Sequence, residues 1–381
     1  MKHNYTNLSS LFLAIASCLC ISVSGQTTDE TEDKTQFSIY GFGRTNFTWD
    51  NQDLGRSDIF KPGDIVVGAE KNSNFFISAR QTRFGFDVKH FFGEDELEIK
   101  LEGDFHDSSS DATGNLRLRH AFAKYKFILV GMTWSNFFDI QANPVTVDFE
   151  GPNSSTLSRT PQVRFFTHTS KNVFSVSLEN PIEKVTISDP IEVLPQRYPD
   201  LIAAYRINGD FGFVKTAGVL REIRYESDKP RSLVGYGLTV MSLIHAGEKD
   251  KIRLQGIIGT GIARYIEGAS GLNYDAIYDG TNELETLQMY GGFFSYQHFW
   301  KEAVYSSFTA GYLGVEDNPN LLPTDYKIGY YGSANVFWSM VKNLTFGAEV
   351  LVGERKNVND QTGTAVRFQM NATYKFNKIF K

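Results

Sequence analysis

Residues 115–166, NLRLRHAFAKYKFILVGMTWSNFFDIQANPVTVDFEGPNSSTLSRTPQVRFF, contain two strand-like runs followed by one long polar segment. The runs 115–125 and 127–134 are separated by a single residue, which predicts a tight hairpin. The segment 135–160 is longer than most connections in compact domains, and such loops are usually functional or disordered. Its aromatic residues argue against disorder. If the chain forms a barrel, we expect this loop to fold inward and narrow the lumen.

The rest of the chain supplies further runs in which polar and apolar side chains alternate. In residues 95–106, Leu97, Ile99 and Leu101 share one face, and the charged residues share the other. This period of two is typical of a strand with one wet and one apolar face. About sixteen strands are predicted, at 37–49, 74–92, 95–106, 115–125, 127–134, 161–169, 172–179, 199–207, 209–225, 231–244, 251–265, 285–299, 302–315, 327–338, 343–354 and 364–376.

The connections between these strands alternate in length. Short turns at 93–94, 126 and 342 contrast with long segments at 50–71, 180–198, 267–284 and 316–326. Short turns on one side and long loops on the other are typical of outer-membrane barrels, and strands of ten or more residues suit a bilayer. A soluble sandwich also alternates, but its strands are usually shorter. We therefore predict an all-β, transmembrane antiparallel β-barrel of about 16 strands with an inward-folded constriction loop.

The first 36 residues have the features of an exported protein. Lys2 and His3 precede an apolar run, and small residues at 23–25 predict a signal peptide, residues 1–25, cleaved after Gly25. A lipobox at 15–18, which would lipidate Cys18, is the alternative. Residues 26–36 form a short acidic tail, and residues 37–381 form one barrel domain. Because the chain's 2 cysteines both lie in the leader, the exported part has no disulfide or thiolate.

Composition and motifs exclude several classes of function. A net charge of −6 provides no basic excess for nucleic acid, and no nucleic-acid-binding motif is present. The sequence has no GxSxG elbow, HExxH motif or P-loop, so we expect no enzyme, no metal and no cofactor. His106 and His120 could resemble a metal-binding or catalytic pair, but we interpret their occurrence as a chance arrangement. An outer-membrane lipase would need a serine beside His120 on the outer surface of the barrel.

Several motifs in residues 77–166 occur in an order that resembles the DcaP-like family of trimeric outer-membrane porins. They are SARQTRFGFDVK, LEGDFH, LRLRHAFAKY, LVGMTWSNFFD, PVTVDFEGP and RTPQVRFF. The resemblance implies a sixteen-stranded homotrimer in outer-membrane lipid that passes small, often anionic solutes such as dicarboxylates. Two departures stand out. The family's usual GQTWS is GMTWS at 131–135, and residues 26–36 are too short for the helical extension that many members carry.

Strand alternation also predicts which charges face the lumen. If Phe376 and its row face lipid, the opposite row of each strand lines the pore. The predicted pore-lining residues are Arg44, Arg83, Lys100, Glu102, Asp104, Arg117, Arg119, Arg164 and Arg367. The loop supplies Asp139, Asp148, Glu150 and Arg159. Cations on one wall and acids on the loop would create a transverse field that selects ions. The alternative is that these charges pair with one another and support the loop.

Two residues break the alternation. It places Arg80 beside Phe84 and His120 beside Phe122, on the face expected to meet lipid. An arginine near the bilayer midplane costs about 2–4 kcal/mol. Either a bulge shifts the register, or another subunit of a trimer covers this wall. The preferred function is a passive diffusion channel for small hydrophilic, anionic solutes, and the alternative is a non-conducting barrel with a structural or assembly role.

Overall fold

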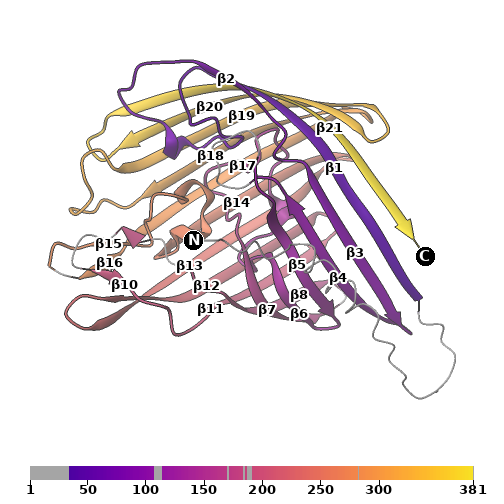
Figure 1. Cartoon of the computed structure of the whole chain (residues 1–381), viewed down its shortest axis with the longest axis horizontal. Coiled ribbons are helices and arrows are strands. Elements are labelled where there is room, and N and C mark those ends of the chain that lie inside the picture. The colour runs from indigo at the N-terminus through magenta and orange to yellow at the C-terminus, as the bar shows by residue number, and fades with distance from the viewer. Residues whose placement is uncertain are drawn as a thin grey trace, which may run out of the picture. The chain divides into compact units, whose positions relative to one another are not determined.

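One closed antiparallel β-sheet forms most of the described part of the chain (Figure 1). The computed structural model describes residues 34–106, 114–169, 171–182, 185–186, 191–281 and 283–380. The sixteen strand positions of this barrel are β1 (Lys34–Asp50), β3 (Arg83–Phe92), β4 (Asp95–Asp104), β5 (Arg117–Tyr125), β6 (Ile128–Trp134), β7 (Arg159–His168), β8 (Asn172–Glu179), β11 (Asp200–Gly209), β12 (Gly212–Glu226), β13 (Pro230–Ala246), β14 (Asp250–Thr260), β17 (Gln288–Lys301), β18 (Val304–Val315), β19 (Tyr326–Val341), β20 (Leu344–Asn357) and β21 (Thr362–Phe380). The predicted fold class and strand number are confirmed.

Two short strands extend existing positions of the barrel. β2 (Asn74–Ser78) pairs with residues 46–50 at the C-terminal end of β1. β3 pairs with residues 34–42 on the same edge of β1. β10 (Glu192–Val193) pairs with β12 beyond the end of β11. A separate small sheet contains β9 (Val185–Thr186), β15 (Ala276–Tyr278) and β16 (Leu284–Thr286). The predicted leader and residues 26–33 of the predicted tail lie outside the described residues, and residues 34–36 belong to β1.

The first and last strands close the barrel. β1 and β21 pair from Phe37 opposite Phe380 to Asp50 opposite Arg367. The other edge of β1 pairs with β2 and β3, and β8 pairs with β11 across the 180–199 connection. In this closure every strand of the barrel pairs with a neighbour on both sides, a condition that a sheet must meet in the core of a bilayer.

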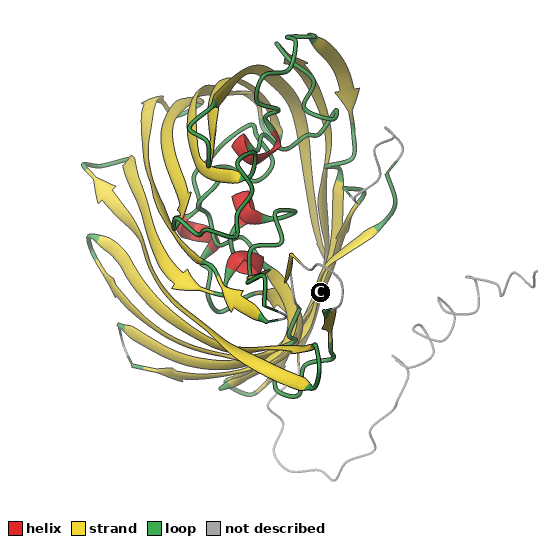
Figure 2. Ribbon diagram, turned by 90° about the vertical axis from the view of Figure 1, so that its left-hand side faces the viewer, coloured by secondary structure: helices red, strands yellow, loops and turns green. Residues whose placement is uncertain are grey.

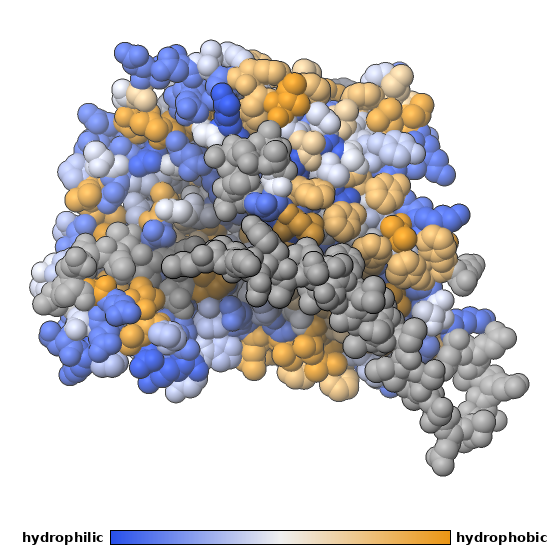
Figure 3. Space-filling view, viewed as in Figure 1, coloured by the Kyte–Doolittle hydropathy of each residue, from blue (hydrophilic) through white to orange (hydrophobic). Residues whose placement is uncertain are grey.

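The side chains follow an inside-out pattern. On β21, Phe368 is 54% and Met370 is 56% exposed, whereas Arg367, Gln369 and Asn371 are buried. Hydrophobic residues gather over the strands, and hydrophilic residues gather at the end that carries the long loops (Figure 3). An apolar outer face around a polar interior is the arrangement of a membrane barrel. Among the described residues, no helix combines the length and apolar character needed to cross a bilayer.

Short turns join the strands at one end of the barrel, and long loops join them at the other. Two-residue turns occur at 93–94, 126–127, 210–211, 302–303 and 342–343. Lys126 (φ 48°) and Asn343 (φ 72°) adopt the left-handed conformation that a tight hairpin requires. The chain therefore has the alternation of connections that the sequence predicted.

Two sequence predictions about the early strands were wrong. Residues 74–92 are not one strand, because a turn in which the Thr82 amide donates to the Ala79 carbonyl separates β2 from β3. On β4 and β5, Glu102 lies opposite His120 but Gly103 lies opposite Leu118. Arg119 is therefore the extra residue of a β-bulge, and the faces predicted for residues 120–125 are inverted.

Loops fold into the barrel and carry its apolar core. Figure 2 shows four short 3₁₀-helices within the ring of strands: η1 (Pro62–Asp64), η2 (Ile140–Ala142), η3 (Ala263–Tyr265) and η4 (Glu267–Ala269). The largest buried apolar cluster joins loop residues, including Phe137, Ile262 and Ile266, to inward-facing wall residues such as Leu313. Apolar packing thus fixes the loops inside the mouth of a polar lumen.

A buried ion pair at the loop end of the seam between β1 and β21 should stabilise the barrel. Arg367 donates to both carboxylate oxygens of Asp50, at 2.6 and 2.9 Å, and both side chains are fully buried. Arg367→Met leaves Asp50 buried without its partner, so we expect a loss of about 3–5 kcal/mol in the free energy of unfolding. Urea unfolding of the barrel in detergent micelles measures this loss.

The matched control is Arg197→Met, which removes an arginine from an exposed pair with Glu222. Exposed pairs contribute little to stability. Equal urea midpoints for Arg367→Met and the wild type would contradict the role assigned to the buried pair.

Candidate functional site

The long loop between β6 and β7, residues 135–158, crosses the lumen. Wall residues far apart around the barrel bind successive points of its backbone. Lys215 of β12 donates to the Phe138 carbonyl (2.7 Å), and Arg253 of β14 donates to the Gln141 carbonyl (3.1 Å). Asn335 and Arg44 donate hydrogen bonds to the carbonyls of Val145 and Val147. The Asp148 amide donates to the carboxylate of Glu349 on β20. The predicted inward folding of this constriction loop is therefore observed in the structure.

Two further loops pack on the constriction loop from the loop end of the barrel. In residues 51–73, the Phe60 amide donates to Asp148, and the Phe149 amide donates to the Asp58 carbonyl. In residues 261–287, the amides of Glu267 and Gly268 donate to the carbonyls of Ser155 and Asn153. The constriction loop is thus held on one side by the wall and on the other by neighbouring loops.

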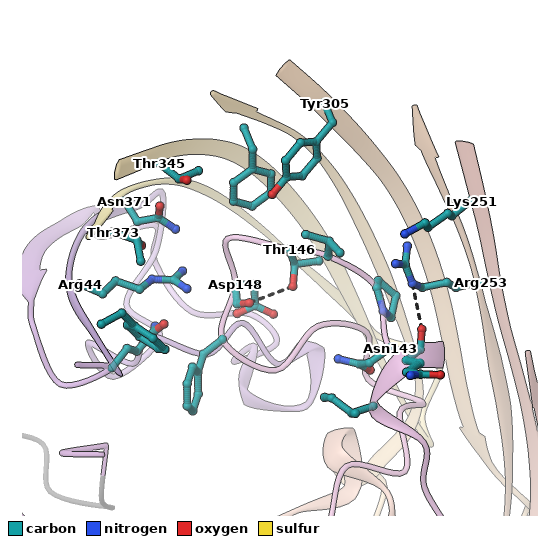
Figure 4. Close-up of a pocket in the computed structure, with 18 of the residues that line it drawn as sticks. Arg44, Asn143, Thr146, Asp148, Lys251, Arg253, Tyr305, Thr345, Asn371 and Thr373 are labelled. Atoms are coloured by element: carbon teal, nitrogen blue, oxygen red, sulfur yellow. Dashed lines mark hydrogen bonds between the residues drawn. The ribbon is translucent and has the colours of Figure 1, made fainter. Parts of the chain in front are cut away.

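A cavity of about 800 Å³ lies between the constriction loop and the wall on the side of the short turns, and we call it the turn-side cavity. Its charged lining consists of Arg44, Arg83, Lys251, Arg253, Lys375 and Asp148, and His245 also lines it. Figure 4 shows Arg44 on one side of the constriction loop and Lys251 with Arg253 on the other. Among the described lining residues, cations therefore outnumber acids by a wide margin.

Asp148, the acid in this lining, is turned away from the solute space. Its carboxylate accepts hydrogen bonds from the amides of Phe60 (2.9 Å) and Gly151 (3.0 Å) and from the Tyr331 hydroxyl (3.3 Å). Burial, reinforced by the nearby charge of Glu349, raises the pKa of Asp148 to about 7. At neutral pH this carboxyl is therefore only partly charged.

A second cavity, of about 510 Å³, lies on the loop side, and we call it the loop-side cavity. It is also rich in cations, with Arg80, Arg117, Arg159 and Arg264 opposite two acids, Glu150 and Glu267. Lys61 lies 2.8 Å from Glu267 and 3.8 Å from Glu150. Burial, together with Glu267, raises the pKa of Glu150.

The structure brings most of the predicted pore-lining residues together as one ion-pair network on β3, β4 and β5. Arg119 contacts Glu102 (2.9 Å) and Asp104 (2.5 Å), and Arg117 forms two 3.0 Å hydrogen bonds to Asp104. The outlying members are Arg83, 3.4 Å from Glu102, and Lys100, 2.9 Å from Asp87. These charges face inward as predicted, but most of them are paired with one another. This favours the alternative interpretation, in which the charges pair and support the loop.

The remaining predicted arginines divide between lining and structural positions. Arg44 lines the turn-side cavity, and Arg164 faces inward, where it donates to Gln162 and to the Trp134 carbonyl. Arg367 faces inward but is fully buried against Asp50, so it does not line either cavity. Arg159 was assigned to the loop, and this was wrong, because it is the first residue of β7.

The predicted loop acids do not project into open lumen. Asp139 binds Arg206 of β11 at 2.7 Å and accepts a hydrogen bond from the Gln141 amide at the start of η2. Asp148 and Glu150 are bound within the loops as described above. The acid half of the predicted transverse field is therefore used to hold the loop in place.

Arg80 and His120 both lie inside their own subunit, so their assignment to a trimer interface is corrected. Arg80, in the turn between β2 and β3, is 3.6 Å from Asp58 and 5% exposed. His120 is turned inward by the bulge at Arg119 and lies 3.0 Å from the Thr133 hydroxyl. A bulge that shifts the register, the first of the two explanations, accounts for His120, whereas Arg80 is turned inward by the turn between β2 and β3. This inward position also removes the outer-surface histidine that the lipase alternative required.

Three basic residues of the turn-side cavity, the cations Lys251 and Arg253 and the imidazole of His245, were missed in the analysis of the sequence. The alternation KIRLQ at 251–255 contained the signal, because Lys251, Arg253 and Gln255 share one face of β14. In the described ranges, no group of three or more His, Cys, Asp or Glu side chains is arranged to hold a metal.

This sixteen-stranded barrel, polar inside and crossed by a constriction loop, defines an outer-membrane β-barrel of the porin type. A family model described as "DcaP outer membrane protein" matches residues 16–376, and the chain belongs to this family. The predicted family and outer-membrane location are thereby confirmed. Met132, where this chain departs from the family's GQTWS motif, lies on the outer face of the barrel. It pairs with Ala121, and Ala121 pairs in turn with the exposed Leu101.

Solved structures share the fold. The outer membrane channel DcaP of Acinetobacter baumannii is 20% identical, with a TM-score of 0.79 over 92% of this chain and 100% of that chain. OmpT, an outer membrane protein of Vibrio cholerae, is 12% identical, with a TM-score of 0.58 over 92% and 100% of the two chains. The anion-selective porin from Comamonas acidovorans is 7% identical, with a TM-score of 0.61 over 90% and 100%. No curated protein matches the chain in sequence.

Asp148 should make the stability of the folded barrel depend on pH. Because its pKa is raised to about 7 from an ordinary value near 4, the folded state favours the protonated form. This stabilisation is fully present below about pH 4 and is lost as the pH rises through 7. Asp148→Asn lacks the titrating group, so its melting temperature should fall less than that of the wild type between pH 5 and pH 8.

The control is Asp95→Asn, at the first residue of β4, where the side chain pairs with Lys126 near solvent, and this variant should keep the wild-type response. Heat-dependent migration on gels, recorded at both pH values, measures the melting temperature. An Asp148→Asn variant with the same pH response as the wild type would contradict the proposed titration.

Proposed function

We propose that the protein is a passive outer-membrane channel that prefers small hydrophilic anions of the dicarboxylate type. Solute moves down its gradient, and no bond is made or broken. The observation that carries this proposal is the excess of cationic side chains in the turn-side cavity. Walls of like charge raise the local concentration of the opposite ion and select it for passage.

The cations that matter most are those without a carboxylate partner. Among the described residues, Arg253 donates to the Gln141 carbonyl and to the side-chain oxygen of Gln297, but it has no acid within salt-bridge distance. Lys251 and Lys375 likewise have no acidic partner there, and Arg44 bonds a carbonyl and an amide oxygen. Uncompensated charge of this kind remains available to a solute.

The placement of these cations supports a preference for solutes with two anionic groups. Arg44 and Lys375 come from β1 and β21, whereas Lys251 and Arg253 come from β14, on the other side of the constriction loop (Figure 4). A guanidinium offers a planar fork of donors that matches a carboxylate. An elongated dianion could therefore contact both walls in succession. We also propose that the protein is a homotrimer, as the family resemblance implies.

One observation favours the competing, non-conducting function. The three inward loops and their apolar cluster occupy the mouth of the barrel and reduce the free lumen to separate cavities. A barrel with a structural or assembly role would not need a continuous open lumen. Solute flux distinguishes the two functions directly.

The selectivity is tested by swelling of proteoliposomes in isotonic solutions of a four-carbon dicarboxylate and a four-carbon diamine. We expect faster swelling with the dicarboxylate. The double variant Lys251→Gln/Arg253→Gln should reduce the ratio of the two rates about threefold or more. Lys89→Gln, which removes a β3 cation that is paired with Glu96 and lines neither cavity, is the matched control.

An unchanged ratio in the double variant would contradict the role of the β14 cations. Absence of swelling with either solute, from a correctly folded barrel, would instead support the non-conducting function.

A further inference from the structure

The two cavities are lined by adjacent residues of the constriction loop. Phe149 lines the turn-side cavity, and the next residue, Glu150, lines the loop-side cavity. The facing wall shows the same division, since Gln81 lines the first cavity and Arg80 lines the second. Neighbouring residues on both elements therefore border opposite compartments. A solute that moves between the cavities along this wall must pass Phe149.

The Phe149 ring lies between a histidine and two arginines. It stacks on His106 with ring centroids 4.4 Å apart and an interplanar angle of 24°. The guanidinium carbons of Arg117 and Arg119 are each 5.7 Å from the ring centroid. His106 and Arg117 line the loop-side cavity, so the ring closes that cavity against the turn-side cavity. Burial, together with Arg117, lowers the pKa of His106 to about 4, so the stacked imidazole is neutral at pH 7.

Phe149 differs from the other aromatic residues of the loop in what surrounds it. Phe137 is fully buried in the main apolar cluster, and Phe138 is buried against Trp134. Phe149 is half-buried, belongs to none of the apolar clusters of the described residues, and faces a charged wall. Core packing therefore does not explain a large apolar ring at this point.

We propose that the Phe149 side chain is the gate between the loop-side and turn-side cavities. This inference rests on the proposed channel function and adds its point of control. The ring covers Arg117 and Arg119 through cation–π contacts, which are weak compared with charge-assisted hydrogen bonds. An anionic solute that binds the Arg117 guanidinium, which lines the loop-side cavity, takes the place of the ring and so opens the passage for itself. A neutral or cationic solute has no such means of displacing it.

The gate is tested by single-channel recording of the full chain in planar bilayers. Phe149→Ala should increase the conductance about twofold or more and weaken the preference for anions. Phe149→Trp, which enlarges the ring, should decrease the conductance. Phe138→Ala removes the same volume from the same loop but lines neither cavity, so its conductance should match the wild type.

A further variant covers the case in which Phe149→Ala does not fold. The chain has only 2 cysteines, both before residue 21, so Phe149→Cys places a single thiol in the barrel. Attachment of a bulky thiol reagent should block current through that variant, with no effect on the wild type. Wild-type conductance in Phe149→Ala, or current unaffected by the attached reagent, would overturn the gate and leave the channel function intact. A wild-type barrel that passes no current would overturn the channel function itself.

Discussion

The pairing of β1 with β21 is the constraint on which the rest of the molecule depends. In hydrocarbon, every backbone amide and carbonyl needs a partner, and only a closed sheet provides one for each strand. Fourteen residue pairs, from Phe37 opposite Phe380 to Asp50 opposite Arg367, close this one. Closure also divides the side chains, because alternate residues must face lipid or lumen. The apolar exterior and the charged interior are therefore two results of the same geometry.

Inside the barrel, the same cations position the constriction loop and line the cavity. Arg44 and Arg253 each donate one hydrogen bond to a loop carbonyl, and each remains in the lining of the turn-side cavity. The loop acids Asp139 and Asp148 are bound by Arg206 and by backbone amides, so they offset little of the lining charge. The position of the loop and the sign of the lumenal charge are thus linked. Removing a wall cation should affect both.

The period-two alternation was sufficient to predict the strand number, the membrane fold and the inward face of β21. It failed where the backbone departs from regular pleating, because the turn before Thr82 and the bulge at Arg119 leave no local signal in the sequence. It also could not show that Arg367 is neutralised by Asp50, 317 positions away, since such pairs exist only after closure. The alternation could have predicted that Arg253 faces the lumen. Its importance could not be predicted, because it depends on where the constriction loop crosses the lumen.

A lumen that conducts and prefers anions is what the turn-side cations imply. Reversal potential of the purified wild-type protein in a planar bilayer, under a tenfold gradient of potassium chloride, tests it most directly. We expect discrete conductance steps and a reversal potential whose sign corresponds to chloride permeating faster than potassium. A reversal potential of the opposite sign would contradict the assigned role of the turn-side cations, and a folded barrel without conductance would contradict the channel itself.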